Sequence, residues 1–220
     1  MIASRSYGTK PRTRLSPNAI FIRGDVGSVA GAQAIAEETL SVLGGVDILV
    51  NNAASGHVFT GGSLTIPDSE WLACLEINFL SAVRLTSALL PGMLERASGV
   101  IVNITSGAAL TAPAPLLHYA AAKAALNSYG KGLATEMAPR GVRVNTVSPG
   151  NVVTPGADAV RDEFTKAYGV TKEIVEAGIP LCRMGVPEDI AEMVGFLVSD
   201  RAAWITGSYF TVDGGEYPSI

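Results

Sequence analysis

The sequence contains little charge and few cysteines or histidines. Only 16% of its 220 residues are charged, and the 16 basic residues are outnumbered by 20 acidic ones, which argues against a basic nucleic-acid-binding protein. Hydrophobic residues make up 48% of the chain, whereas disordered chains combine low hydrophobicity with high net charge. The composition therefore predicts extensive burial, either in a sheet covered on both faces or in a surface shared between subunits.

The two cysteines, Cys74 and Cys182, lie far apart, and neither belongs to a CxxC pair or a Cys/His cluster. This pattern indicates no metal site and no disulfide framework, so we expect two buried thiols in a reducing compartment such as the cytoplasm. The longest stretch without a charged residue, 97–122, contains Asn103 and Pro113, which break it as a membrane span. We expect a soluble protein without a membrane partner.

Short apolar runs alternate with helical patterns from residue 19 onward, which predicts βα units and a parallel sheet. The runs are rich in β-branched residues and mostly lack polar alternation, as expected of strands buried on both faces. The expected strands are Ala19–Arg23, Val46–Asn51, Val100–Thr105, Val142–Val147 and Tyr209–Val212.

Four helices are expected between these strands, and no linker divides the chain, so we predict one domain over residues 1–220. The helices are expected from the cap Ser28 to Gly44–Gly45, from the cap Asp68 onward through Thr86, over Leu116–Ala138, and from Pro187 to before Asp200.

The first 24 residues include five basic and no acidic side chains. A start of this kind is compatible with a transit peptide, but Pro11 and Pro17 interrupt any amphipathic helix there. The favoured interpretation is the end of a strand followed by a solvated loop.

Tyr119 and Lys123 are four residues apart on the third helix, so their side chains project from one face. A Lys ammonium beside a phenol favours the phenolate, so we expect a Tyr119 pKa lowered towards the range of a general acid or base. Ser106 follows the strand 100–105, at the edge where parallel strands deliver side chains to a crevice. Asn78 lies inside the second helix, where Asn is a poor helix former.

Each of these residues alone has an ordinary structural explanation: a surface pair, a strand-end hydroxyl, or a polar residue at a helix kink. His118, next to Tyr119, is within reach of a substrate, but we expect a half-exposed bystander. Together, Asn78, Ser106, Tyr119 and Lys123 resemble the catalytic tetrad of the classical short-chain dehydrogenases/reductases.

Neighbouring motifs carry the same resemblance, which covers nearly everything from Gly24 onward. Asn51–Ala54 resembles the NNAG motif of that family, and Pro149–Thr154 resembles its PGxVxT motif. The segments that resemble its C-terminal portion are Arg183–Asp189, Ile205–Gly207 and Val212–Gly215.

The resemblance implies a Rossmann-like, doubly wound parallel sheet in three α/β/α layers, with a role for each matching residue. Tyr119 is then the acid and base, Lys123 tunes it and binds the nicotinamide ribose, Ser106 orients the carbonyl or alcohol, and Asn78 anchors a water in a proton relay. The implied cofactor contacts are Arg5, Asp25, Val26, Asn52, Ala53, Tyr119, Lys123, Pro149, Gly150, Val152 and Thr154.

The beginning of the chain departs from the pattern of the family. No TGxxxGxG turn precedes Gly24, and Met1–Arg5 resembles the end of the second strand, where Arg marks a preference for NADP(H) over NAD(H). We therefore expect a fold that is incomplete at the N-terminus, with weakened pyrophosphate binding and unpaired strand edges.

The resulting hypothesis is an NAD(P)-dependent oxidoreductase that interconverts a carbonyl and a secondary alcohol, as a homodimer or homotetramer. The alternative is a catalytically silent remnant of the family that acts as an oligomerisation or regulatory subunit. The resemblance disfavours an enoyl reductase. In the enoyl reductases of the family the Tyr and Lys are expected to be further apart than the four residues that separate Tyr119 and Lys123.

Overall fold

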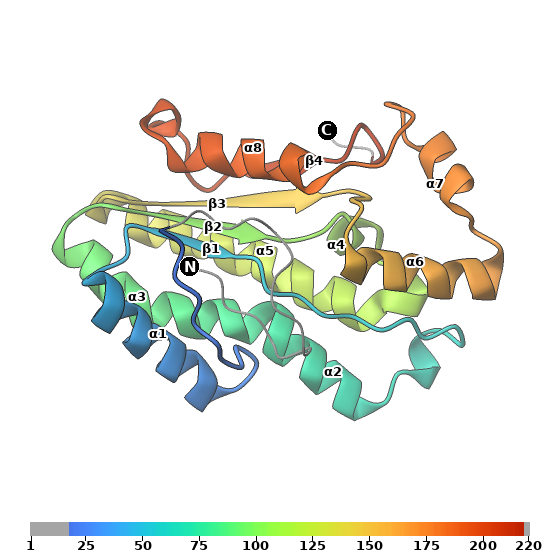
Figure 1. Cartoon of the computed structure of the whole chain (residues 1–220), viewed down its shortest axis with the longest axis horizontal. Helices are drawn as coiled ribbons and strands as arrows, with labels where there is room; N and C mark the ends of the chain where they lie inside the picture. Colours follow the sequence, from blue (N-terminus) through green and yellow to red (C-terminus); the bar gives the residue numbers. More distant parts are fainter. Residues whose placement is uncertain (1–17, 218–220) are drawn as a thin grey trace.

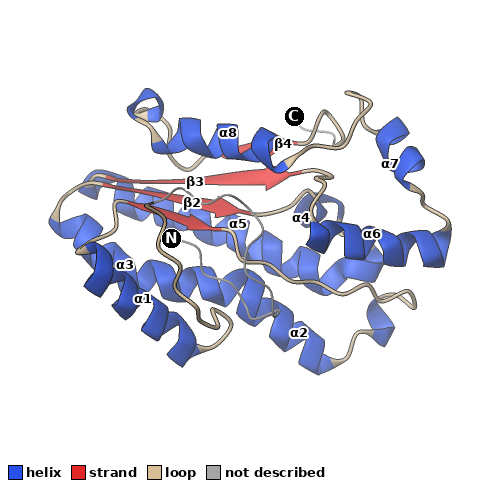
Figure 2. Ribbon diagram, viewed as in Figure 1, coloured by secondary structure: helices blue, strands red, loops and turns tan. Residues whose placement is uncertain are grey.

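Four parallel strands form a sheet with helices on both faces, as Figures 1 and 2 show for the computed structural model, which describes residues 18–217. The strands are β1 (Ile48–Asn51), β2 (Gly99–Ile104), β3 (Val142–Pro149) and β4 (Tyr209–Val212), in the spatial order β1-β2-β3-β4. Each strand pairs in parallel with its neighbour, for example Asn51 with Asn103 and Asn103 with Thr146. The predicted α/β fold with a Rossmann-like parallel sheet is confirmed.

The helices separate into two covering layers and a group at the carboxyl ends of the strands. In Figure 1, α8 covers one face of the sheet, α1, α2, α3 and α5 lie on the other, and α4, α6 and α7 gather near the arrowheads. The helix bounds are α1 Val29–Leu43, α2 Asp68–Leu75, α3 Ser81–Glu95, α4 Ala108–Thr111, α5 Leu117–Met137, α6 Pro155–Tyr168, α7 Lys172–Gly178 and α8 Pro187–Val198.

The predicted ends of α1 are confirmed in detail. The Ser28 side chain accepts a hydrogen bond from Gly31 N, and Gly44 adopts the left-handed conformation at the C-cap with φ of 72°. At α2 the prediction was off by one residue, because Pro67 is the N-cap and Asp68 is the first helical residue.

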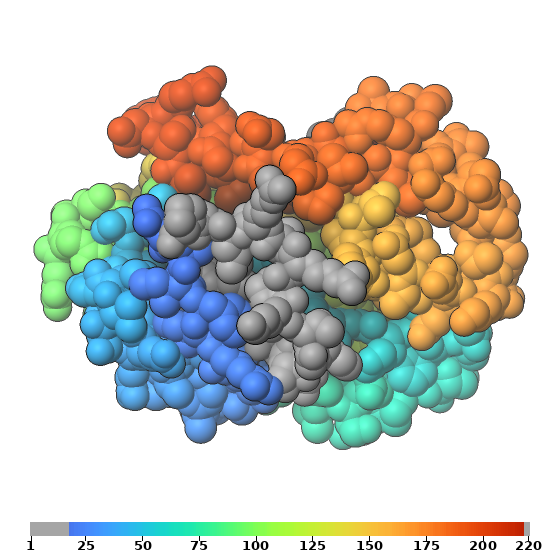
Figure 3. All heavy atoms as spheres, viewed as in Figure 1, coloured from blue at the N-terminus to red at the C-terminus, as the bar shows by residue number. Residues whose placement is uncertain are grey.

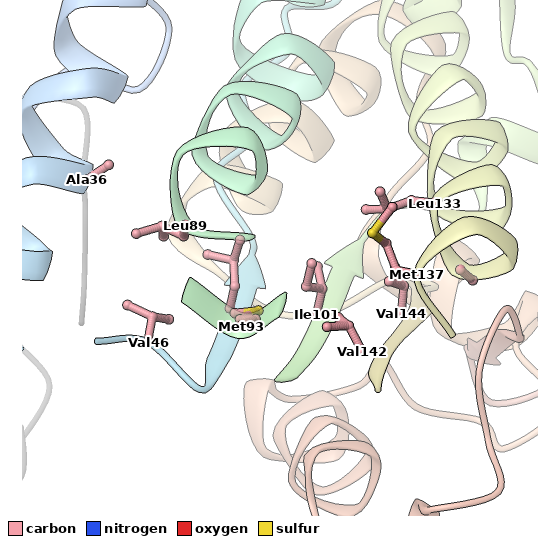
Figure 4. Packing of buried hydrophobic residues seen from close by; sticks show 11 residues of the cluster. Ala36, Val46, Leu89, Met93, Ile101, Leu133, Met137, Val142 and Val144 are labelled. Carbon is pink, nitrogen blue, oxygen red and sulfur yellow. The ribbon is translucent and has the colours of Figure 1, made fainter. Parts of the chain in front are cut away.

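Alternating side chains of the middle strands fill two cores. On one face, Ile101 and Val144 pack with Leu89 and Met93 of α3 and Leu133 of α5 (Figure 4). On the other face, strand residues pack under α8; this second core contains Val102, Ile104, Val147, Leu197 and Ala202. Burial on both faces fixes the carboxyl ends of β2 and β3.

The outer part of the sheet corrects two predictions. Residues 19–23 contain a single bridge residue, Phe21, because no described strand runs alongside them to form a ladder. β1 is not buried on both faces: Ile48 is 46% exposed and Val50 41% exposed, since β1 has only one neighbour in the described sheet.

One helical stretch in the described residues, Asp68–Glu95, is long and apolar enough to cross a membrane by length and composition. Its apolar window is 44% buried inside the fold, and α3 packs against α1 and β2. The stretch is interrupted by a π-helical turn, Glu76–Leu80, that contains Asn78. These features are those of a helix in a protein core.

Candidate active site

Helix α5 presents Tyr119 and Lys123 one turn apart, as the sequence predicts. Lys123 is 1% exposed, and its Nζ donates a hydrogen bond to the Ile104 carbonyl oxygen at 3.0 Å. The same ammonium lies 5.8 Å from the centroid of the Tyr119 ring. The last residue of β2 therefore fixes the Lys123 charge beside the phenol.

Ser106 meets Tyr119 just beyond the end of β2. The Tyr119 hydroxyl is hydrogen-bonded to the Ser106 side chain, whose Oγ also accepts from Ala108 N at 3.2 Å. Gly56, in the loop after β1, lies against the other side of the phenol, where an added Cβ would be 3.2 Å from Tyr119 Cδ2. The segments after β1 and β2, together with helix α5 itself, thus fix the position of the phenol.

The electrostatics of the pair differ from the prediction. Burial raises the pKa of Tyr119 to about 12, although the Ser106 hydrogen bond lowers it and Cys74 nearby raises it further. Burial lowers the pKa of Lys123 to about 8, with Cys74 acting in the opposite direction. Desolvation therefore outweighs the expected effect of Lys123 on the phenol, and near neutral pH both groups keep their protons.

Asn78 lies 1% exposed in the π-helical turn between α2 and α3. Its Nδ2 donates to the carbonyl oxygens of Ser55 at 2.7 Å and Cys74 at 3.0 Å, and its Oδ1 accepts from Ser55 N at 3.2 Å. The side chain therefore joins the loop after β1 to the widened helix. Its expected role as a water anchor stays a prediction.

The segment after β3 supplies the other wall of the site. Pro149 accepts from Gly107 N at 3.1 Å through its carbonyl oxygen, and Gly150 N donates to Val212 O at 3.1 Å. Val152 forms a parallel bridge with Gly185, and the Thr154 side chain caps α6 by accepting from Ala157 N at 3.2 Å. The motif of residues 149–154 thus spans the ends of β2, β3 and β4 and begins a helix.

Helix α6 reaches across to the loop after β1. Val58 N donates to Glu163 Oε2 at 3.1 Å, and the Tyr168 hydroxyl donates to the Thr60 carbonyl oxygen at 2.9 Å. Figure 3 shows the two segments side by side. This contact places α6 at the border of the site.

The residues expected on the adenosine side form a separate group. Val26 is 1% exposed and packs with Ile22 and Ile35, and Ala53 packs against the same cluster. The Val26 side chain is therefore part of the core, and only its backbone remains for a ligand. Asp25 is exposed and accepts from Gly27 N at 3.0 Å, Asn52 is exposed, and Arg5 lies outside the described residues.

Two residues near the C-terminus, Glu216 and Tyr217, border the site although they belong to none of the sequence motifs. The Tyr217 ring packs on Gly107, where an added Cβ would be 1.9 Å from Tyr217 Cε2, and Tyr217 is close enough to Tyr119 for the two phenols to interact electrostatically. The Glu216 carboxylate accepts from Asn151 N at 2.9 Å and from Asn151 Nδ2 at 2.5 Å. The only sequence signal was the adjoining 212–215 motif, whose loop turns back to the ends of β2 and β3.

Two further expectations were wrong. His118 is 1% exposed rather than half-exposed, because its ring packs edge-on against Phe59 and Trp71 at centroid distances of 5.4 Å and 6.1 Å. Cys182 is exposed rather than buried; it lies in a turn with φ of 52°. Cys74 is buried as expected, with its Sγ 3.2 Å from Asn78 Nδ2.

The donors at this edge of the sheet fit a nicotinamide dinucleotide. Lys123 carries three N–H donors, of which the hydrogen bond to Ile104 accounts for one, so the ammonium can also bind ribose hydroxyls. The Thr154 hydroxyl and the start of α6 offer the donors and the dipole that favour a phosphate.

Comparisons with known proteins agree with this arrangement. Residues 8–216 match a family model described as Enoyl-(Acyl carrier protein) reductase. The chain is 39% identical over 185 residues to the 3-oxoacyl-(acyl-carrier-protein) reductase FabG of Vibrio cholerae, an alignment that covers 84% of this chain and 72% of the relative. The FabG of Haemophilus influenzae is 32% identical over 241 residues, covering 99% of this chain and 96% of the relative.

A solved structure gives the same picture in three dimensions. The L-sorbose reductase of Gluconobacter frateurii, crystallised with NADPH and L-sorbose, superposes with a TM-score of 0.81 at 34% identity. The superposition covers 90% of this chain and 76% of that chain.

Proposed function

Because the chain belongs to the short-chain dehydrogenase/reductase family, we propose that it is an NAD(P)-dependent oxidoreductase that interconverts a ketone and a secondary alcohol, with Tyr119 as acid and base. The observation that carries this proposal is the Tyr119 hydroxyl hydrogen-bonded to Ser106 with the buried Lys123 one helical turn away.

In the reduction, Tyr119 donates its proton to the carbonyl oxygen as negative charge develops there. Burial keeps the phenol protonated until that moment, because it raises the pKa of Tyr119 to about 12. Ser106 is the second hydroxyl at the same place, and it orients the carbonyl oxygen and donates to it. In the oxidation, the Tyr119 phenolate accepts the proton of the alcohol, and Ser106 orients the alcohol oxygen.

Lys123 acts on the phenol rather than on the substrate. Its ammonium, fixed by the Ile104 carbonyl oxygen, stabilises the phenolate that remains after the proton has left. Asn78 fixes the loop at Ser55, and the neighbouring Gly56 supports the phenol ring, so Asn78 positions Tyr119 indirectly.

When bound, the reduced nicotinamide supplies the hydride that goes to the carbonyl carbon. Lys123 and the segment 149–154 are proposed to bind its nicotinamide side, and Asp25, the Val26 backbone, Asn52 and Ala53 its adenosine side. NADP(H) is proposed over NAD(H); the support is Arg5 and the NADPH bound by the L-sorbose reductase.

The proposed substrate class is a ketone or 3-oxoacyl compound rather than an enoyl compound. The two FabG relatives carry the name of 3-oxoacyl reductases, although the family model is described by an enoyl reductase. The Ser106–Tyr119 hydrogen bond supports the carbonyl, because it brings two hydroxyl donors to one acceptor oxygen.

The proposal includes a homodimer or homotetramer in the cytoplasm, formed by the single domain predicted from the sequence. The low charge of 16% supports a surface partly buried between subunits. Leu72 of α2 is 58% exposed and supports a contact on that helix.

The test is oxidation of NADPH and NADH by the purified protein with a 3-oxoacyl thioester, a simple ketone and an enoyl thioester. We expect turnover of the carbonyl compounds, and Tyr119→Phe should lower kcat about a hundredfold or more because the proton donor is lost. Circular dichroism of the variant controls for folding. Turnover of the enoyl thioester alone, or a Phe variant as active as the original, contradicts the proposal, and a folded, silent protein favours the regulatory alternative.

A further inference from the structure

A cavity of about 160 Å³ lies next to the proposed active site, between the loop after β1 and helices α2 and α5. Its lining includes Gly56, His57, Glu70, Cys74 and His118. The His57 side chain is 57% exposed and marks the solvent end, whereas Cys74 and His118 are buried. The cavity therefore leads from the surface to the residues that surround Tyr119.

The His118 ring is the polar group that this cavity serves. It is 1% exposed, and neither Nδ1 nor Nε2 has a hydrogen-bond partner among residues 18–217. Buried polar groups are almost always hydrogen-bonded, so both nitrogens require a partner that enters the cavity. The edge-on contacts with Phe59 and Trp71 hold the ring in place and supply no hydrogen bond to its nitrogens.

The surrounding groups select a neutral partner. Glu70 is already paired with His57, with Oε2 and Nδ1 3.0 Å apart, and its carboxylate disfavours an anion nearby. Burial lowers the pKa of His118, although Glu70 opposes this, and burial raises the pKa of Cys74 to about 11, so the imidazole and the thiol are both neutral. A neutral imidazole has its donor and its acceptor on separate nitrogens, and a hydroxyl group, which can both donate and accept, can pair with either of them.

We propose that this cavity is a hydroxyl-binding subsite in which His118 binds an alcohol group of the substrate or an ordered water. The inference rests on the proposed function for its position: Gly56, which lines the cavity, also lies against the Tyr119 ring. A ketone whose carbonyl oxygen is at Ser106 and Tyr119 can then extend a hydroxylated arm towards His118. The proposed substrates are therefore ketones that also carry a hydroxyl group several carbon atoms away from the carbonyl.

The first test compares two ketones of equal carbon-chain length, 2-pentanone and 5-hydroxy-2-pentanone, with His118→Phe, His118→Gln and the control Gly132→Ala. Gly132 of α5 is outside the cavity lining, and nothing lies within 4 Å of an added Cβ there. We expect the ratio of kcat/KM for the hydroxyketone over the plain ketone to fall about tenfold in His118→Phe. His118→Gln keeps a donor and an acceptor and should restore most of that ratio, and Gly132→Ala should leave it unchanged. A parallel fall for both ketones, with the ratio preserved, identifies water as the hydroxyl source.

The second test needs no variant of His118 and no turnover. The sequence contains two histidines, so His57→Gln assigns the imidazole signals in a long-range ¹H–¹⁵N NMR spectrum of the whole protein. The proposal expects both His118 nitrogens at hydrogen-bonded shifts, which move on addition of 5-hydroxy-2-pentanone if the substrate is the source. Nitrogens at shifts typical of no hydrogen bond overturn it. Failure of the proposed function appears separately, as a wild-type protein that reduces neither ketone.

Discussion

The middle of the sheet and its β1 edge differ in how completely neighbouring elements bury them. β2 and β3 are covered on both faces, and their carboxyl ends carry Ser106 and the segment from Pro149. β1 exposes Ile48 and Val50, and the residues expected on the adenosine side adjoin it. The reacting groups are thus fixed by two buried strands and a long helix, whereas within residues 18–217 the nucleotide side is fixed by fewer neighbours. Geometry for chemistry and affinity for the cofactor can therefore change independently.

The largest expected effect compares equal substitutions in the two regions. Val144→Ala, at a β3 position that is 0% exposed, should lower the free energy of unfolding by about 2 kcal/mol because it leaves a cavity in the core. Val50→Ala, at a β1 position that is 41% exposed, should change it by less than about 0.5 kcal/mol. Urea unfolding measures both. Equal losses would mean that the β1 edge is covered in solution and that the contrast is wrong.

A second prediction concerns pH and the charge buried at the middle strands. The pKa of Lys123 is about 8 in the folded chain against an ordinary 10.5, so between these values the unfolded chain binds more protons. Wild-type stability relative to Lys123→Met should therefore rise with pH from 8 to about 10, by at most about 1.4 kcal/mol per pH unit. Below pH 8 the difference should be constant.

Urea unfolding of both proteins at pH 7, 8 and 9.5 makes this measurement. The upper limit avoids the range in which Tyr119 acts oppositely, since its raised pKa lowers stability as pH rises from 10 to about 12. A difference that falls between pH 8 and 9.5 would contradict a desolvated Lys123.

The smallest effect tests the nucleotide side alone. An added Cβ at Gly31 of α1 would be 2.0 Å from the Asp25 carbonyl oxygen, whereas at Gly132 of α5 nothing lies within 4 Å. Gly31→Ala should therefore displace the Asp25 loop and raise KM for NADPH about fivefold, or about 1 kcal/mol, with kcat within about twofold.

Gly132→Ala is the matched control, since both substitutions replace glycine by alanine inside a helix and gain the same propensity. Steady-state kinetics with varied NADPH distinguish them. An unchanged KM in Gly31→Ala would remove Asp25 from the cofactor site.

Local sequence signals predicted most helices and strands. They failed where contacts with distant segments determine whether a strand forms. The caps Ser28 and Gly44 and the spacing of Tyr119 and Lys123 are local, and the structure places them as expected. Residues 19–23 have a strand composition, but strands need a partner, which no local pattern specifies.

The same distinction holds for the site. Ser106 and Tyr119 were predicted because, taken together with Asn78 and Lys123, they resemble the tetrad of a known family. The burial of His118 and the contact of Tyr217 with Gly107 depend on segments far apart in sequence, and the raised pKa of Tyr119 depends on the sum of that burial. Desolvation is a property of the assembled fold, so the spacing of Tyr119 and Lys123 alone predicted a lowered pKa for Tyr119 where the pKa is raised.

The π-helical turn Glu76–Leu80 also sets the rotational phase between two helices. One residue corresponds to about 100° of helical rotation, so removing a residue from the turn would swing α2 around its axis relative to α3. Glu70 and Cys74 would then leave the cavity wall while α3 kept its packing on the sheet. The turn therefore lets one continuous helical stretch serve a fixed core at one end and a polar site at the other.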